Sequence, residues 1–205
     1  MSETPSALDR RAQRSRELIL EALFALMTER GYERLTIQNL IDRAGVGRAT
    51  FYAHFESKEE LLATSIGRLR AWLVQMHRAA GGEPLGFTLP FFQHLASHQR
   101  IYRMTVARES ETSVERHIRQ MLAELVREDL RRWRSPSAAR LDLATHYVVG
   151  ALWASFIWWM ESPQPLPPEE LNALFQQLTF PGLEATLAMG NELPRPALLK
   201  LPAAA

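Results

Sequence analysis

The chain has 205 residues, of which 46% are hydrophobic and 23% charged, a composition typical of a folded globular protein with one or two domains. It contains no cysteine, which excludes disulfide frameworks, thiolate metal sites and cysteine nucleophiles. The formal net charge is only +1, divided as +2 on residues 1–80 and −1 on the rest, so charge alone does not indicate a nucleic-acid partner.

Residues 1–31 predict a polar N-terminal segment followed by one helix. The first residues are polar and lead into a cluster of arginines, which is unlike a signal peptide, and no apolar run approaches the ~20 residues of a membrane helix. We therefore expect a cytoplasmic protein without a membrane partner. An apolar stripe from Leu18 to Leu26 at helical spacing indicates a helix that ends at Gly31.

Two short helices and a long one are expected next. Thr36 is the predicted N-cap of the first short helix, and the second covers about 48–54. Ser57 and Glu60 have the spacing of a capping box at the start of the long helix, which extends to about Arg78.

The rest of the chain predicts helices alone. Gly81 and Gly82 interrupt the pattern, and no segment beyond them shows the period-two alternation of a strand. The tail from Asn191 is rich in proline and alanine, and we expect it to be poorly ordered. The predicted fold class is therefore all-α. The expected helices of this part cover about 87–98, 100–109, 112–134, 138–161 and 167–189.

The two short helices fit a helix-turn-helix motif. Ala44 is small where the helices must cross, Gly45 tolerates the positive φ that the tight turn needs, and Val46 can fill the core beneath it. Phe51 and Phe55 would anchor the second helix to the core, which leaves its polar face free for a DNA groove.

The run from Leu35 to Leu62 resembles the DNA-binding domain of TetR-type transcriptional regulators, and the similarity extends over roughly residues 12–65. The resemblance implies a three-helix helix-turn-helix DNA-binding domain, joined by a long helix to an α-helical ligand-binding and dimerisation domain. It also implies a bacterial, nucleoid-associated homodimer on a palindromic operator in double-stranded DNA. The implied ranges are 1–56 for the N-terminal arm and DNA-binding domain, 57–80 for the linking helix, 81–190 for the effector-binding and dimerisation domain, and 191–205 for a disordered tail.

The resemblance further implies which residues contact DNA. Gln38 and Arg48 are the candidates for base edges, because Gln can pair with adenine and Arg with guanine in the major groove. Thr36 and Lys58 would contact phosphates. Taken alone, Arg48 would be an ordinary surface arginine, so its role depends on the motif around it. The full candidate set is Thr36, Gln38, Arg48, Ala49, Thr50, Tyr52, His54 and Lys58.

The last two helices carry the expected dimer interface. The segment from Leu141 to Met160 is apolar nearly all round, so it must be buried on several sides. In the resembled family such helices pair with their copies in a four-helix bundle. The alternative is that these side chains only fill the core of one subunit. The candidate interface residues are Trp153, Trp158, Leu171, Leu174, Phe175 and Leu178.

The resemblance also implies an effector pocket in the C-terminal domain that opens toward the linking helix. A mostly aromatic, weakly charged lining would favour a flat or apolar molecule, although core packing is the alternative for each residue. His94 and His98 have metal-ligand spacing without a third ligand, so we expect no metal and no cofactor. The candidate lining residues are Phe91, Phe92, His94, Tyr102, Met104, His146, Trp153 and Phe156.

These observations predict a ligand-responsive, homodimeric transcriptional repressor whose effector acts through helix 57–78. One alternative is a constitutive DNA-binding protein of the same fold, which a closed and fully packed C-terminal domain would favour. Another is a small helical enzyme that uses the aromatic cavity with His94, His146 or Glu109. The chain contains no Walker loop and no nucleophile elbow, so we expect no catalytic residues.

Overall fold

The computed structural model describes residues 7–106, 112–134, 136–163 and 165–188. Within these ranges the chain forms α-helices, one 3₁₀ turn at Tyr32–Arg34 and no strand, which confirms the all-α prediction. The predicted tail 191–205 and Glu109 of the enzyme alternative lie outside the described residues. The helices are α1 (Ala7–Arg30), α2 (Ile37–Ala44), α3 (Arg48–Tyr52), α4 (Lys58–Ala79), α5 (Thr88–Ser97), α6 (Gln99–Val106), α7 (Ser113–Arg134), α8 (Ala138–Glu161) and α9 (Pro168–Ala188).

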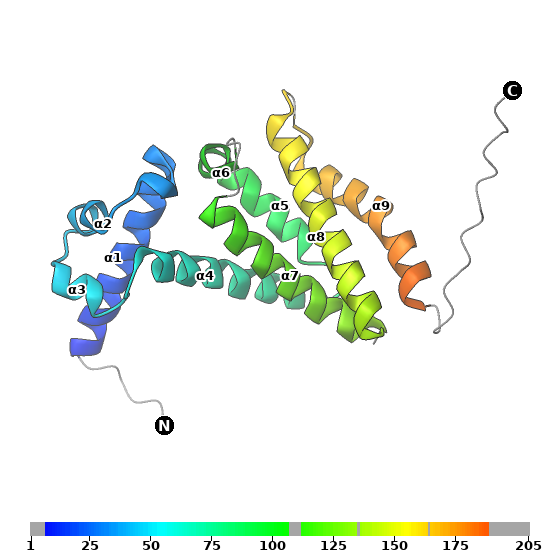
Figure 1. The fold of residues 1–205 in the computed structure, drawn as a ribbon, viewed down its shortest axis with the longest axis horizontal. Coiled ribbons are helices and arrows are strands. Elements are labelled where there is room, and N and C mark those ends of the chain that lie inside the picture. The colour runs from blue at the N-terminus through cyan, green and yellow to red at the C-terminus, as the bar shows by residue number, and fades with distance from the viewer. Residues whose placement is uncertain (1–6, 107–111, 135, 164, 189–205) are drawn as a thin grey trace, which may run out of the picture.

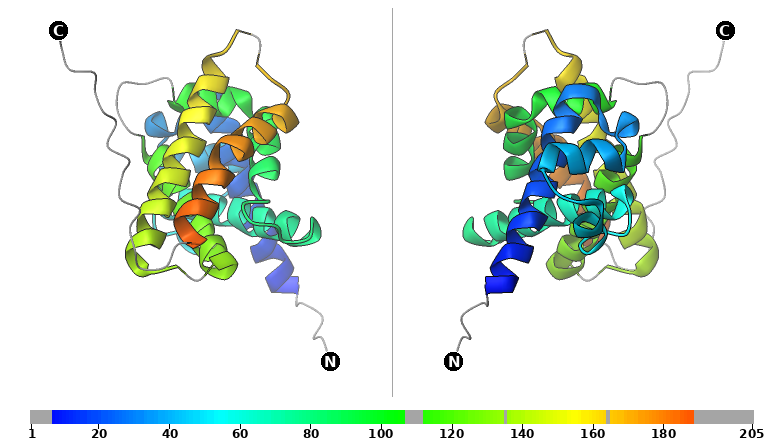
Figure 2. Two further views of the ribbon diagram at one scale, coloured as in Figure 1. Left: turned by 90° about the vertical axis from the view of Figure 1, so that its right-hand side faces the viewer. Right: turned by 90° about the vertical axis from the view of Figure 1, so that its left-hand side faces the viewer.

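The helices form two groups that α4 connects (Figure 1). Helices α1 to α3 lie at one end, and α5 to α9 form a larger helical body at the other (Figures 1 and 2). Helix α1 packs on α2 and also contacts α6, while α4 packs on α7. Helices α8 and α9 lie beside each other on the side of the body that is remote from α1 to α3.

The capping and turn signals of the N-terminal group are present in the structure. The Thr36 hydroxyl accepts a hydrogen bond from the Asn39 N–H, and the Asn39 side chain accepts one from the Thr36 N–H, so the box is complete. Gly45 has the expected left-handed conformation, with φ of 66°. Ser57 caps α4 by accepting from the Glu60 N–H, but the Glu60 carboxylate accepts from Glu56 N–H and not from that of Ser57.

The core of the N-terminal group forms where α1, α2, α3 and the start of α4 meet. Leu23, Leu40, Phe51 and Leu61 are completely buried there, and Phe55 is 2% exposed. Because α3 has only five residues, it cannot hold its shape by its own hydrogen bonds. Its aromatic anchors in this core therefore fix its position.

A buried carboxylate ties the far end of α4 to the body. Asp129 of α7 accepts a hydrogen bond from the Leu85 N–H at 2.6 Å, and its other oxygen lies 3.3 Å from His77 Nε2 near the end of α4. Leu85 has a φ of 56°, an uncommon conformation for a residue with a branched side chain. The loop between α4 and α5 is thus held by α7.

None of the helices in the described ranges is long and apolar enough to span a lipid bilayer.

Candidate nucleic-acid interface and internal cavity

Helices α2 and α3 present a polar row on one face of the N-terminal group. The Gln38 amide donates to Asp42 Oδ1 at 2.8 Å, and Arg48 Nη2 donates to Gln38 Oε1 at 3.3 Å. All three side chains belong to exposed residues. Arg48 thus keeps donors free for a groove while its guanidinium is already oriented by Gln38. Asp42 is not among the predicted residues, although its i, i+4 spacing from Gln38 indicates this contact.

The remaining candidates on α3 have different degrees of exposure. Tyr52 is 48% exposed and packs edge-to-face against Phe51, with ring centroids 5.5 Å apart. Ala49 is exposed and Thr50 is half-buried. The Tyr52 ring is therefore supported by the core and its outer part is free, which suits a side chain that braces against a DNA backbone.

His54 and Lys58 already have protein partners. His54 Nε2 lies within hydrogen-bond distance of Ser15 Oγ on α1, at 2.8 Å. The Lys58 ammonium donates to the Leu35 carbonyl at 3.1 Å and lies 4.6 Å from the centroid of the Tyr32 ring. Both groups stabilise the junctions between helices, and their contacts with DNA stay predictions.

The structure divides the predicted dimer residues into two sets. Trp153, Leu171 and Phe175 are buried inside the subunit, at 6%, 3% and 3% exposure. The other three lie on the outer side of α8 and α9 and are exposed. Two further large apolar residues of α8 that the sequence analysis did not select are exposed as well. The exposed set is Leu143, Tyr147, Trp158, Leu174 and Leu178.

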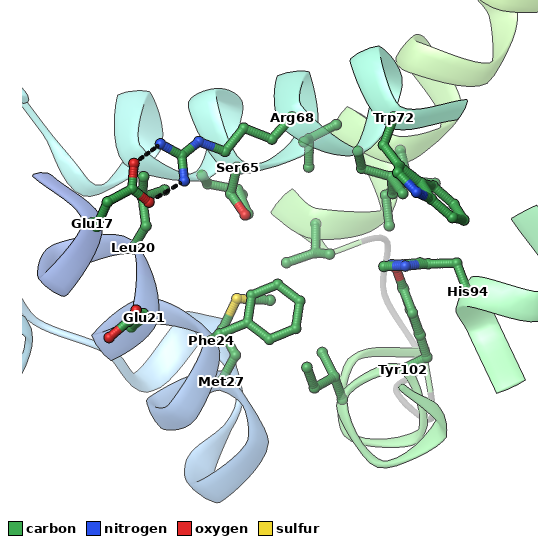
Figure 3. Close-up of a pocket in the computed structure, with 16 residues that line it drawn as sticks. Glu17, Leu20, Glu21, Phe24, Met27, Ser65, Arg68, Trp72, His94 and Tyr102 are labelled. Carbon is green, nitrogen blue, oxygen red and sulfur yellow. Dashed lines mark hydrogen bonds and ion pairs between the residues drawn. The ribbon is translucent and has the colours of Figure 1, made fainter. Parts of the chain in front are cut away.

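A cavity of about 540 Å³ lies between the N-terminal group and the body (Figure 3). It is bounded by α1 and α4 on one side and by α5, α6 and α7 on the other. The lining residues are Glu17, Leu20, Glu21, Phe24, Met27, Leu62, Ser65, Ile66, Arg68, Leu69, Trp72, His94, Ile101, Tyr102, Val114 and Ile118.

Of the predicted pocket residues, the structure places only His94 and Tyr102 at this cavity. His146 is on the outer surface of α8, where its side chain is 72% exposed. Met104 belongs to α6, but its side chain is outside the described part of the chain. The other four, Phe91, Phe92, Trp153 and Phe156, are core residues of the body that do not line the cavity.

Helix α1 contributes to the cavity, which the sequence analysis did not anticipate. Its residues Leu20, Phe24 and Met27 follow helical spacing, and they form a second apolar stripe beside the one that packs on α2. Phe24 is 38% exposed although it is aromatic. The signal for this contribution is the presence of two apolar stripes on α1, because a helix that packs on only one neighbour needs only one apolar stripe.

The polar groups of the cavity lie at two separate ends. At one end Arg68 donates two hydrogen bonds to the Glu17 carboxylate, at 2.6 and 2.7 Å, which lowers the pKa of Glu17 and raises that of Arg68 (Figure 3). At the other end His94 Nε2 lies 3.1 Å from the Tyr102 hydroxyl. Burial lowers the pKa of His94 to about 4, with the neighbouring His98 as a second cause, so the ring is neutral at pH 7.

The imidazoles of His94 on α5 and of His98, the C-cap of that helix, lie with ring centroids 4.3 Å apart and ring planes tilted by 33°. His98 Nδ1 is bonded to the His94 carbonyl, so each ring has one nitrogen engaged within the protein. Within the described ranges no three His, Asp or Glu side chains are arranged to share a metal ion.

Family models match both parts of the chain. Residues 19–64 match a model described as "Bacterial regulatory proteins, tetR family", and residues 82–180 match one described as "Transcriptional regulator C-terminal region". The first match covers the second half of α1, α2, α3 and the start of α4, and the second covers the body from the loop before α5 into α9.

Three curated proteins are similar to the N-terminal part. The uncharacterized HTH-type transcriptional regulator YxbF of Bacillus subtilis is 35% identical over 88 residues, or 42% of this chain and 23% of that protein. The HTH-type transcriptional regulator TcmR of Streptomyces glaucescens is 32% identical over 40% of this chain and 37% of its own length. The HTH-type transcriptional repressor KstR of Mycobacterium tuberculosis is 41% identical over 31% and 29%. The match therefore spans well under half of each relative.

Solved structures resemble the whole fold. A TetR transcriptional regulator from Streptococcus agalactiae has a TM-score of 0.66 and 25% identity, with 84% of this chain and 97% of that chain covered. NalD of Pseudomonas aeruginosa, described as the secondary repressor of the MexAB-OprM multidrug efflux pump, has a TM-score of 0.60 and 22% identity, with 84% and 96% covered. The second likeness concerns the fold alone.

Proposed function

The chain belongs to the TetR family of bacterial transcriptional regulators, and we propose that it acts as a homodimeric repressor that leaves a palindromic operator when a small molecule binds to it. We expect it to act in the bacterial cytoplasm, bound to the nucleoid. We propose no enzymatic activity for it. A similar protein, KstR, is described as a repressor, which supports this sign of regulation.

The observation that carries the DNA-binding proposal is the polar row of α2 and α3 on a rigid apolar support. Gln38 and Arg48 are exposed and mutually oriented, while Phe51 directly behind them is completely buried. A recognition helix fixed in this way can enter a major groove without first having to fold. In a two-fold dimer, two such helices would read half-sites about one helical turn (~34–36 Å) or slightly more apart.

Direct binding to DNA tests this proposal. Fluorescence anisotropy would compare DNA from beside the protein's own gene with a scrambled duplex of equal length, both at moderate salt. We expect a clear preference for the native duplex, with two protomers per site. Failure to bind either duplex at low salt would overturn the proposed function, and equal, weak, salt-sensitive binding to both would contradict sequence-specific regulation.

The exposed apolar side of α8 and α9 supports the homodimer. Trp158, Leu174 and Leu178 lie there at 54%, 43% and 79% exposure in the single chain. Large apolar side chains gathered on one side of two neighbouring helices are typical of an interaction surface. A second copy with the same surface would cover them through a four-helix arrangement about a two-fold axis.

Leu178→Asp tests this interface, because a buried charge without a partner would oppose the contact of the two copies. We expect the dimer to dissociate at least about tenfold more readily, as measured by sedimentation equilibrium, a change of ~1.4 kcal/mol. Gln120→Asp, which adds the same charge to an exposed position of α7, is the matched control. Unchanged dissociation for Leu178→Asp would place the interface elsewhere.

The cavity supports effector control over the constitutive alternative. Its volume of about 540 Å³ lies within the range of about 300–1,000 Å³ of small-molecule sites. It touches α4, through which we expected the effector to act, and it also touches α1 of the DNA-binding domain. A ligand there would change the contact between the reading helices and the body directly. A coupling of ~1–3 kcal/mol would lower the DNA affinity about 5–150-fold.

A further inference from the structure

Charge is unevenly distributed around the cavity between α1 and the body. Two carboxylates, Glu17 and Glu21, and one guanidinium, Arg68, are its lining groups with a full charge in the described part of the chain. Arg68 binds Glu17 in a bidentate geometry, so these two charges neutralise each other. Glu21 lies on α1 at the same end, one helical turn from Glu17, and has no ion-pair partner among the described residues (Figure 3).

The opposite end of the cavity carries no charge. The His94 imidazole and the Tyr102 hydroxyl face each other there, and both are neutral at pH 7 because burial disfavours their charged forms. This end can bind a hydroxyl, carbonyl or simple apolar group. It offers nothing to balance an anion, since the imidazole resists protonation.

The walls between the two ends are apolar and partly aromatic. Phe24 and Trp72 project from α1 and α4, and the two residues remain 38% and 37% exposed (Figure 3). The face of an aromatic ring attracts an ammonium group and repels a carboxylate. Aliphatic side chains such as Met27, Leu69 and Ile118 complete the lining.

We propose that this cavity binds an amphiphilic amine, with the ammonium group at Glu21 and the apolar body between Phe24 and Trp72. The inference rests on the proposed function, in which the same cavity is the effector site. It adds the chemical class of the effector: an organic cation with an aromatic or aliphatic body, and not a carboxylate, a phosphate or a sugar.

Three probes with one body and different head groups test the proposal. The probes are 6-phenylhexylamine, 6-phenylhexanol and 6-phenylhexanoate, titrated into the full chain at pH 7.5 by isothermal titration calorimetry. We expect the amine to bind about tenfold more tightly than the alcohol, and the carboxylate to bind most weakly. Equal affinities, or tighter binding of the carboxylate, would overturn the proposal.

One variant and its control test whether Glu21 binds the ammonium group. In Glu21→Gln the affinity for the amine should fall severalfold, toward that of the alcohol, while the affinity for the alcohol stays the same. Glu161→Gln, an exposed position at the end of α8, is the matched control and should bind all three probes as the unmodified protein does. An unchanged affinity of Glu21→Gln for the amine would contradict the assigned role of this carboxylate.

Ser65→Phe checks that the probes occupy the cavity, since Ser65 is a half-buried lining residue of α4 that points into it. The added ring should weaken the amine and the alcohol together. The rest of α4 is unchanged in this variant, and the melting temperature of the variant shows whether it is folded. Unchanged affinity of the folded variant for both probes would place their site elsewhere and overturn the proposal.

The same probes separate this inference from the proposed function. If the amine binds at Glu21 and the operator affinity does not change, the assigned ligand class holds and the effector role of the cavity fails. If operator release follows the carboxylate and not the amine, effector control holds and the assigned ligand class is overturned.

Discussion

The helix-turn-helix segment and the cavity place their functional side chains in opposite ways. In the first, Gln38 and Arg48 lie on the outside of a small packed core, and their neighbours along two short helices hold them. In the second, the side chains point inward from five helices that are far apart along the chain (Figure 3). The first arrangement depends on local structure and the second on how the two halves of the molecule meet.

The two regions are therefore sensitive to different kinds of substitution. A change inside the N-terminal core should remove DNA binding by unfolding its support, whereas a change in the cavity wall should leave the fold in place and alter the ligand. Phe51 and Phe24 represent these two cases, because one is completely buried and the other is 38% exposed at the cavity.

The largest expected effect is that of Phe51→Ala. Removal of a completely buried aromatic ring leaves a cavity in the N-terminal core, so we expect the free energy of unfolding to fall by about 3–5 kcal/mol in urea denaturation. Phe24→Ala is the matched comparison and should cost clearly less, since its ring is already partly in contact with solvent. Equal losses of unfolding free energy in the two variants would contradict this difference between the N-terminal core and the cavity wall.

Arg48→Ala should leave the fold intact and weaken operator binding by about 1–3 kcal/mol, with relaxed preference at one base position. Lys58→Ala should weaken binding to all sequences alike and lower the salt slope by about 1. Anisotropy titrations on operator variants measure both effects. A uniform loss over all sequences for Arg48→Ala would show that this arginine contacts the backbone and not a base.

Acid should destabilise the body through His94, by about 2 kcal/mol between pH 7 and pH 5. The pKa of this imidazole is lowered to about 4 in the folded chain, whereas it is about 6.5 in an unfolded one. The unfolded state therefore binds the proton first, and stability is lost as the pH falls from about 6.5 toward 4. Urea titrations at several pH values should show a flatter dependence for His94→Gln. An identical dependence in both proteins would contradict the assignment.

The smallest expected effect on stability is that of the ion pair between Glu17 and Arg68. Both side chains are about 40% exposed, at 38% and 42%, and such pairs contribute only about 0–1 kcal/mol. Arg68→Gln should therefore change the melting temperature little. It should tighten the binding of 6-phenylhexylamine, because the Glu17 carboxylate would lose its cation. Weaker binding of the amine would argue against an acidic end of the cavity.

Much of the N-terminal group could be predicted because its signals are local. Thr36 as an N-cap, Gly45 at a positive φ and Phe51 as a core anchor each follow from a few neighbouring residues. The family model confirms the resemblance that these residues suggested. The contact between Gln38 and Asp42 is equally local and was still missed, because Gln38 was considered only as a DNA contact and Asp42 was not among the predicted residues.

The body was harder to predict because α8 is apolar nearly all round. Its periodicity does not tell which side faces the core, and so Trp153 and Trp158, predicted together, lie on different sides of the helix. His146 was expected to face the pocket and is instead on the outside. The second apolar stripe of α1 indicates a further neighbour, but it does not tell that this neighbour is α6, on which α1 packs over a long distance in the chain.

The buried contact of Asp129 with His77 and Leu85 fixes one end of α4, so that α4 can rotate as a rigid helix about this end. Its 22 residues span about 33 Å at 1.5 Å per residue. Because the His77 end is fastened to α7, a rotation about that point moves the Lys58 end most. Lys58 and His77 are about 28 Å apart along the helix at 1.5 Å per residue, so a tilt of about 7° displaces the Lys58 end by ~3.5 Å. This displacement is close to the rise of one base pair along DNA. In the proposed dimer, such a tilt would shift each DNA-binding domain by about one base pair along its half-site.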